Sequence, residues 1–166
     1  MKNKGKILIG IITVALFCLL FAVNVFAGED VAIDATNFPD DNFRAYVSDN
    51  FDQNNDGFLQ DSEISAVTRI DVAKKNITSL KGVEYFTKLT QLICKNNSLT
   101  SLDVSKNIEL EYLWCSINPL EELNVSKNLA LSILICEETS LTTIDVSKNL
   151  ALQSFFVVKI CLQAWM

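Results

Sequence analysis

Residues 52–63 carry the densest set of oxygen-bearing side chains in the chain. Their sequence, DQNNDGFLQDSE, matches the pattern D-x-[DN]-x-[DN]-G-x5-E at every specified position. Oxygens on alternate residues of a tight turn, a glycine at the reversal and a closing glutamate together suit Ca2+. The predicted metal ligands, which include one main-chain carbonyl at the seventh position, are Asp52, Asn54, Asp56, Phe58, Gln60 and Glu63.

The alternative is a surface turn rich in Asn and Asp whose spacing is accidental. The apolar Leu59 at the eighth position and a helical pattern ahead of the loop favour the calcium site. The sequence contains one such loop, so the site is unpaired. We therefore expect one structural Ca2+ with weak affinity, on the order of 10⁻⁴ to 10⁻³ M.

Helices on both sides are expected to position this loop. Residues 37–41, NFPDD, are typical of a helix start, with Asn37 or a neighbour as the cap and two aspartates at the positive end of the dipole. Phe43, Tyr46 and Val47 then share one face of a helix that ends near Phe51. A short exit helix follows the loop, and residues 28–66 form the predicted helical, EF-hand-like cap.

The rest of the chain is organised by a repeat of 21 residues. It begins at Leu89 with L-x-x-L-x-C-x-x-N-x-L-x-x-L-D-V-S-K-N, and a fixed period of this length predicts a stacked solenoid of leucine-rich repeats. The fold class is therefore an α/β solenoid of about four turns, with a 21–22-residue period, behind the helical cap. Each later turn is expected to hold one short concave strand and a second extended arc on its back. Buried asparagine ladders are predicted at Asn97 and Asn118, and at Asn107, Asn128 and Asn149.

The cysteines recur at one position of each repeat. Four cysteines follow residue 27, an even number that would also suit disulfides. However, Cys94, Cys115 and Cys136 occupy equivalent positions 21 residues apart, where side chains on stacked strands run parallel and are poorly aimed for bridging. We interpret these three as small core residues, whereas Cys161 has no obvious partner.

The residues that point outward from the concave strands are unusually apolar. The predicted binding residues on this face are Ile93, Tyr112, Trp114, Ile133, Ile135 and Phe156. An apolar column in register on a solvent face, centred on a tryptophan, favours an interface. The alternative is that β-branched and aromatic residues simply suit strand positions.

The two ends of the chain and the charge distribution bound the remaining possibilities. Residues 1–27 read as a signal peptide, with an uncleaved membrane anchor as the alternative. Without them the formal charge changes from −6 to −9, and residues 28–66 hold ten acids against one base. An acidic head argues against nucleic acid and for a cation. Residues 67–166 form the predicted solenoid, and its last turn is degenerate or truncated. The uncapped C-terminal edge of the solenoid predicts self-association.

Several motifs together resemble the secreted leucine-rich-repeat proteins of Gram-positive bacteria. They are N-F-P-D-x-x-F-R-x-Y-V at residues 37–47, the acidic loop, S-L-K-G-V-E-Y-F-T-K-L-T at residues 79–90, and repeats of the L-D-V-S-x-N type. The resemblance implies secreted or surface placement, with binding of a protein or another extracellular macromolecule. Relatives of this broader class include invasion and adhesion proteins.

The resulting hypothesis is an exported, calcium-stabilised leucine-rich-repeat module that binds a surface macromolecule through its concave face. The alternative is a non-binding structural spacer or a truncated fragment of a larger surface protein. An enzyme is disfavoured because the chain has no histidine, no glycine-rich phosphate loop and no cysteine paired with a base.

Overall fold

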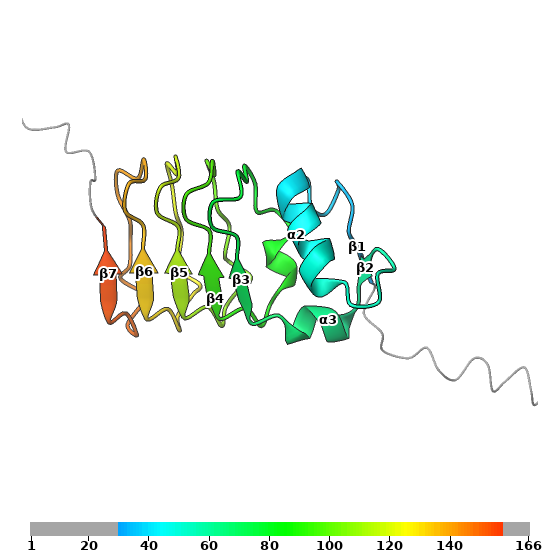
Figure 1. Cartoon of the computed structure of the whole chain (residues 1–166). Coiled ribbons are helices and arrows are strands. Elements are labelled where there is room, and N and C mark those ends of the chain that lie inside the picture. Colours follow the sequence, from blue (N-terminus) through cyan, green and yellow to red (C-terminus); the bar gives the residue numbers. More distant parts are fainter. Residues whose placement is uncertain (1–29, 158–166) are drawn as a thin grey trace, which may run out of the picture.

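The computed structural model describes residues 30–157, which form a helical N-terminal part and a stack of parallel strands (Figure 1). The helical part packs against the first strand of the stack, and the strands follow one another along a single axis. The elements in chain order are β1 (Val31–Ala32), α2 (Asp41–Phe51), β2 (Phe58–Leu59), α3 (Asp61–Ala66), β3 (Arg69–Asp71), η1 (Val83–Tyr85), β4 (Gln91–Ile93), β5 (Tyr112–Trp114), β6 (Ile133–Ile135) and β7 (Ser154–Phe156).

Helix α2 begins and ends where its polar and apolar pattern indicates. Its cap is Asp40, whose carboxylate accepts the main-chain N–H of Phe43 at 2.9 Å. Asn37 does not cap the helix: its side chain donates to the carbonyl of Ala32 and accepts the hydroxyl of Tyr85. The helix buries Phe43 and Val47 and ends at Phe51, as predicted.

The five strands β3 to β7 form one parallel sheet in sequence order. Arg69 pairs with Gln91, a step of 22 residues, and the following steps from Gln91 to Tyr112, Ile133 and Ser154 are 21 residues each. The predicted period of 21–22 residues is confirmed. Each of these strands is only three residues long and forms few hydrogen bonds. Buried leucines in and around the strands therefore also hold the sheet together.

The back of the later repeats carries no regular secondary structure. Within residues 30–157 no repeat has a second strand, and back segments such as residues 101–104 belong to no helix, strand or turn, so the extended arc stays a prediction. The D/N-V-S segments form turns in which the side chain of Asp103, Asn124 or Asp145 accepts the N–H two residues later, at 2.8–3.0 Å. Asn and Asp side chains favour such local turns, so each back segment ends in a turn of this kind.

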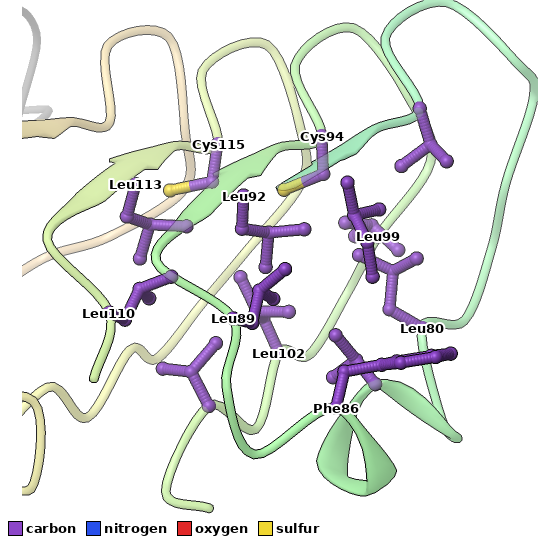
Figure 2. Packing of buried hydrophobic residues seen from close by; sticks show 14 of the residues in the cluster. Leu80, Phe86, Leu89, Leu92, Cys94, Leu99, Leu102, Leu110, Leu113 and Cys115 are labelled. Carbon is purple, nitrogen blue, oxygen red and sulfur yellow. The ribbon is translucent and has the colours of Figure 1, made fainter. Parts of the chain in front are cut away.

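The core runs between the sheet and the back turns and ends before β7, where Phe155 is 41% exposed. Figure 2 shows Leu89, Leu92 and Leu99 of one repeat beside Leu110 and Leu113 of the next, and all five are fully buried. Each leucine contacts its counterparts one step along the axis, so the same small set of positions generates a continuous core. Leucines at this spacing therefore define both the register and the interior.

Both predicted asparagine ladders are present. The amide of Asn97 accepts the N–H groups of Lys75 and Ile77, and donates to the carbonyls of Val72 and Cys94. The second ladder only donates: Asn128, for example, donates to carbonyls of the preceding turn, and its own side-chain carbonyl oxygen has no hydrogen-bond partner. Buried amides thus hold successive turns together by binding main-chain groups.

Two contacts fix the helical part to the stack. The second carboxylate oxygen of Asp40 accepts both the N–H and the hydroxyl of Thr78 at 2.8 Å each. Gly82 lies against the buried ring of Phe38 with φ of 105°. These contacts join segments about 40 residues apart in sequence, so the helical part and the first turn share one core.

Some predictions concern residues outside 30–157. The signal peptide at residues 1–27, the free Cys161 and the degenerate C-terminal turn beyond Val157 are among them. Within the described residues, no helix combines the length and the apolar composition needed to cross a bilayer.

Candidate calcium loop and concave face

The loop of residues 52–60 is closed by side chains that bind its own main chain. Asp52 is buried, and its two carboxylate oxygens accept the N–H groups of Asp56 and Gly57 at 3.2 and 3.0 Å. Gly57 supports the reversal with φ of 83°. The side chains of Asn54 and Gln60 both donate to one oxygen of Asp56, at 2.8 and 3.0 Å. The predicted ligands of positions 3, 5 and 9 therefore converge on one point.

Glu63 has a different arrangement from the one expected of a closing ligand. It is 6% exposed, and its two oxygens accept the N–H groups of Gln53 and Gln60 at 2.7 and 3.0 Å. The second bond caps the first turn of α3. Glu63 thus ties the two ends of the loop together. Phe58, whose carbonyl is the remaining predicted ligand, lies in β2, where that strand pairs with β1.

The chemistry of this donor set fits a hard cation. The residues that converge on Asp56 carry only oxygen and amide groups, and the amides of Asn54 and Gln60 can present their carbonyl oxygens after a half-turn. The hydrogen bond from the N–H of Phe58 lowers the pKa of Asp56. Desolvation opposes this, but the hydrogen bonds from Asn54 and Gln60 add to it, and the net shift is downward. The described residues contain no group of three His, Cys, Asp or Glu side chains arranged to hold a metal.

The concave face presents a continuous column of side chains. The register places Ile93, Trp114, Ile135 and Phe156 side by side on neighbouring strands. Phe156 is 51% exposed, and Trp114 and Ile135 are half-buried. Ile93 is only 8% exposed, contrary to the expectation of an outward residue. Tyr112 and Ile133, both half-buried, form a second column beside the first.

Trp114 is held by polar neighbours that sequence reasoning did not pair with it. Its indole N–H donates to the hydroxyl of Ser116 at 3.1 Å, and the ammonium of Lys95 lies 3.4 Å from the ring centroid. A cation over a tryptophan face is favourable by about 0.5–2 kcal/mol. Lys95 is one 21-residue step before Ser116, so the repeat period could have identified this contact.

The three cysteines of the array are buried and free, as predicted. In Figure 2 the sulfur atoms of Cys94 and Cys115 point the same way along the stack rather than toward each other. Burial raises the pKa of Cys94 to about 12 and that of Cys136 to about 11. A thiol with so high a pKa is protonated at neutral pH and is a poor nucleophile, so this column is part of the core.

Comparison with known proteins agrees with this geometry. The functional domain of InlJ from Listeria monocytogenes, a domain that includes a cysteine ladder, superposes with a TM-score of 0.72 at 35% identity, covering 80% of this chain and 29% of that one. The chain has an internalin-like leucine-rich-repeat fold. Internalin J of L. monocytogenes serotype 4b is 38% identical over 70 residues, which are 42% of this chain and 8% of that protein.

A further internalin structure supports the fold at lower identity. Internalin C2 of L. monocytogenes superposes with a TM-score of 0.64 at 18% identity, over 78% of this chain and 58% of that one. No protein-family model matches the chain. The chain spans less than a third of the length of the two internalin J relatives, so it corresponds to a part of such proteins.

Proposed function

We propose that this chain is an extracellular recognition module that binds a protein or another surface macromolecule through its concave face. The observation that carries the proposal is the column through Trp114, which places aromatic and branched apolar side chains in register across four strands. Trp and Tyr are enriched among residues that dominate binding energy. The similarity to internalins adds the expectation of a protein partner and of a secreted or surface-attached location.

Calcium is the second part of the proposal. One Ca2+ would be held by oxygens of Asp52, Asn54, Asp56 and Gln60 together with the carbonyl of Phe58, and Glu63 would complete the set by leaving the main-chain N–H groups it now binds. The ion would supply positive charge that holds the acidic loop closed. Its role is stabilisation of the part that caps the solenoid, rather than direct contact with a partner.

The recognition part is tested by screening the immobilised chain against purified extracellular proteins and glycans. Trp114→Ala is expected to weaken capture of any specific ligand by at least about tenfold, because an interface tryptophan contributes about 2 kcal/mol or more. Leu129→Ala is the matched control, since Leu129 is 61% exposed and lies outside the concave strands. A ligand whose capture is equally strong with both variants would exclude the concave face as its site, and no capture of any ligand by the wild-type chain would favour a spacer.

A further inference from the structure

A row of turns follows the concave strands along one edge of the stack. Lys74, Asn96, Ile117 and Glu138 occupy its equivalent positions, each with φ between 52° and 58°. Main-chain bonds continue from turn to turn: Asn96 N–H donates to Ser116 at 2.9 Å, and Ile117 N–H donates to Glu137 at 2.9 Å. The turns are thus spaced like strands, about 4.8 Å apart. We call residues 74, 95–96, 116–117 and 137–138 the turn ridge.

The turn ridge has a regular order of charge. Lys74 and Lys95 occupy its first two turns, uncharged residues occupy the third, and Glu137 and Glu138 occupy the fourth. All four charged residues border one hollow of about 250 Å3 beside Trp114. None of the ion pairs among the described residues uses them, although the ammonium of Lys95 also lies over the ring of Trp114. The ridge is therefore positive at one end and negative at the other, over three steps or roughly 14 Å.

Ile117, in the uncharged third turn of the ridge, has an unfavourable backbone conformation. Its φ is 57°, and its side chain is 43% exposed. A left-handed backbone costs roughly 1–2 kcal/mol for an ordinary residue and is rarest for a β-branched one. Asn96, at the same position of the preceding turn, is of a type that tolerates this conformation. Ile117 leaves 43% of its surface exposed in this strained conformation, and a partner surface would cover it.

We propose that the turn ridge is a contact between two antiparallel copies of this chain. A two-fold rotation about an axis between the second and third turns of the ridge brings Lys74 of each copy against Glu137 and Glu138 of the other. These charge pairs then form twice, and Ile117 of each copy lies near the axis, opposite Asn96 of the other. Such a self-complementary patch is what a two-fold interface requires.

The charge order argues for this occupant over others. A uniformly acidic or basic partner would be attracted at one end of the ridge and repelled at the other, and like-charge juxtaposition disfavours wrong partners. A second copy reverses the order by rotation alone. The ridge spans only four turns, so its contact area lies below the roughly 1,200–2,000 Å2 of a stable interface. The dimer is therefore weak, with a dissociation constant of about 10⁻⁵ to 10⁻³ M, and sensitive to salt.

Analytical ultracentrifugation of the full chain, produced by secretion, tests the proposal with charge variants. The wild-type chain is expected to dimerise in low salt, at about 0.02 M, and to dissociate in about 0.5 M salt. Lys74→Glu with Lys95→Glu makes the ridge acidic, and Glu137→Lys with Glu138→Lys makes it basic. Each double variant alone is expected to be monomeric, and their equimolar mixture is expected to form a heterodimer. A melting curve of each variant checks that it is folded.

Ile117→Asn separates the contact from general stability. Asparagine relieves the backbone strain, so the melting temperature is expected to rise, while self-association weakens by at least tenfold. If Ile117 had only a structural role, the substitution would change the melting temperature and leave self-association unchanged. The proposal is overturned if the wild-type chain is monomeric in low salt. It is also overturned if each double variant self-associates as strongly as the wild-type chain, which is the result expected of association through the edge of β7.

Discussion

At the scale of single residues, Asp40 connects the helical part to the array. Its carboxylate accepts three donors, one from Phe43 and two from Thr78. Burial by itself raises the pKa of Asp40, but these hydrogen bonds lower it by more. The pKa of Asp40 therefore lies below its ordinary value of 3.8. The charged form is therefore the one that the fold binds. Its contribution to stability is fully present above about pH 4 and is lost as the pH falls through the lowered pKa.

Asp40→Asn is expected to lower the free energy of unfolding at pH 7 by about 1–3 kcal/mol. An amide has one oxygen, so either Phe43 or Thr78 meets an NH2 group and loses its acceptor. Urea denaturation at several pH values measures the effect, and the difference from wild type should shrink below pH 4. Asp41→Asn is the matched control, because Asp41 is 87% exposed and pairs only with Arg44 on the surface. Equal losses for both variants would contradict this role of Asp40.

At the scale of elements, the approach of η1 to the N-terminal part depends on Gly82. A Cβ at Gly82 would lie 2.2 Å from a ring carbon of Phe38 and 2.9 Å from the carbonyl oxygen of Asn37. Phe38 is fully buried and has no room to move. Gly82→Ala is therefore expected to reduce the free energy of unfolding by about 2–3 kcal/mol, from overpacking and from a strained φ.

Gly57→Ala provides the control for that substitution. Gly57 also has a positive φ, 83°, but a Cβ there would meet nothing within 4 Å. Backbone strain alone should reduce the free energy of unfolding by about 1 kcal/mol. Both variants are compared by urea denaturation without calcium. If Gly82→Ala were no more harmful than Gly57→Ala, close packing against Phe38 would not be what holds η1 in place.

Sequence patterns predicted those elements that depend on regularly spaced residues. Leucines at a fixed spacing determine the strand register, because a shift would move Leu92 or Leu113 out of the core. The back turns were missed because Asp103 and its counterparts act locally, through a hydrogen bond two residues away, rather than by periodicity. The burial of Ile93 was missed because it depends on neighbours such as Trp114 on other strands. Glu63 illustrates the same limit: its ligand position is readable, but its present partners are not.

At the scale of the whole molecule, calcium is expected to raise the melting temperature. An ion that binds only the folded chain stabilises it by RT ln(1 + [L]/Kd), which is about 1.4 kcal/mol at tenfold excess over Kd. For a chain of this size, the melting temperature should rise by roughly 3–8 °C at about 10 mM calcium. Differential scanning calorimetry measures the rise.

Loop variants distinguish calcium binding from a general effect of salt. Asp52→Ala and Glu63→Gln each remove a predicted ligand, and both also lose main-chain hydrogen bonds, so each variant is compared with and without calcium. The calcium-dependent rise should disappear in both, while Asp49→Asn, on helix α2 outside the loop, should retain it. An unchanged rise in the two loop variants would disprove the calcium site.

The column of buried thiols also makes the opening of each repeat measurable by chemical labelling. One free thiol is buried in each of three successive turns, so each is expected to react only when its own turn opens. In a stack where each repeat contacts only its neighbours, the turns need not open together. A thiol reagent followed by mass spectrometry would therefore record the order in which the repeats separate. The three buried cysteines are thus built-in labelling sites for following the unfolding of a solenoid repeat by repeat.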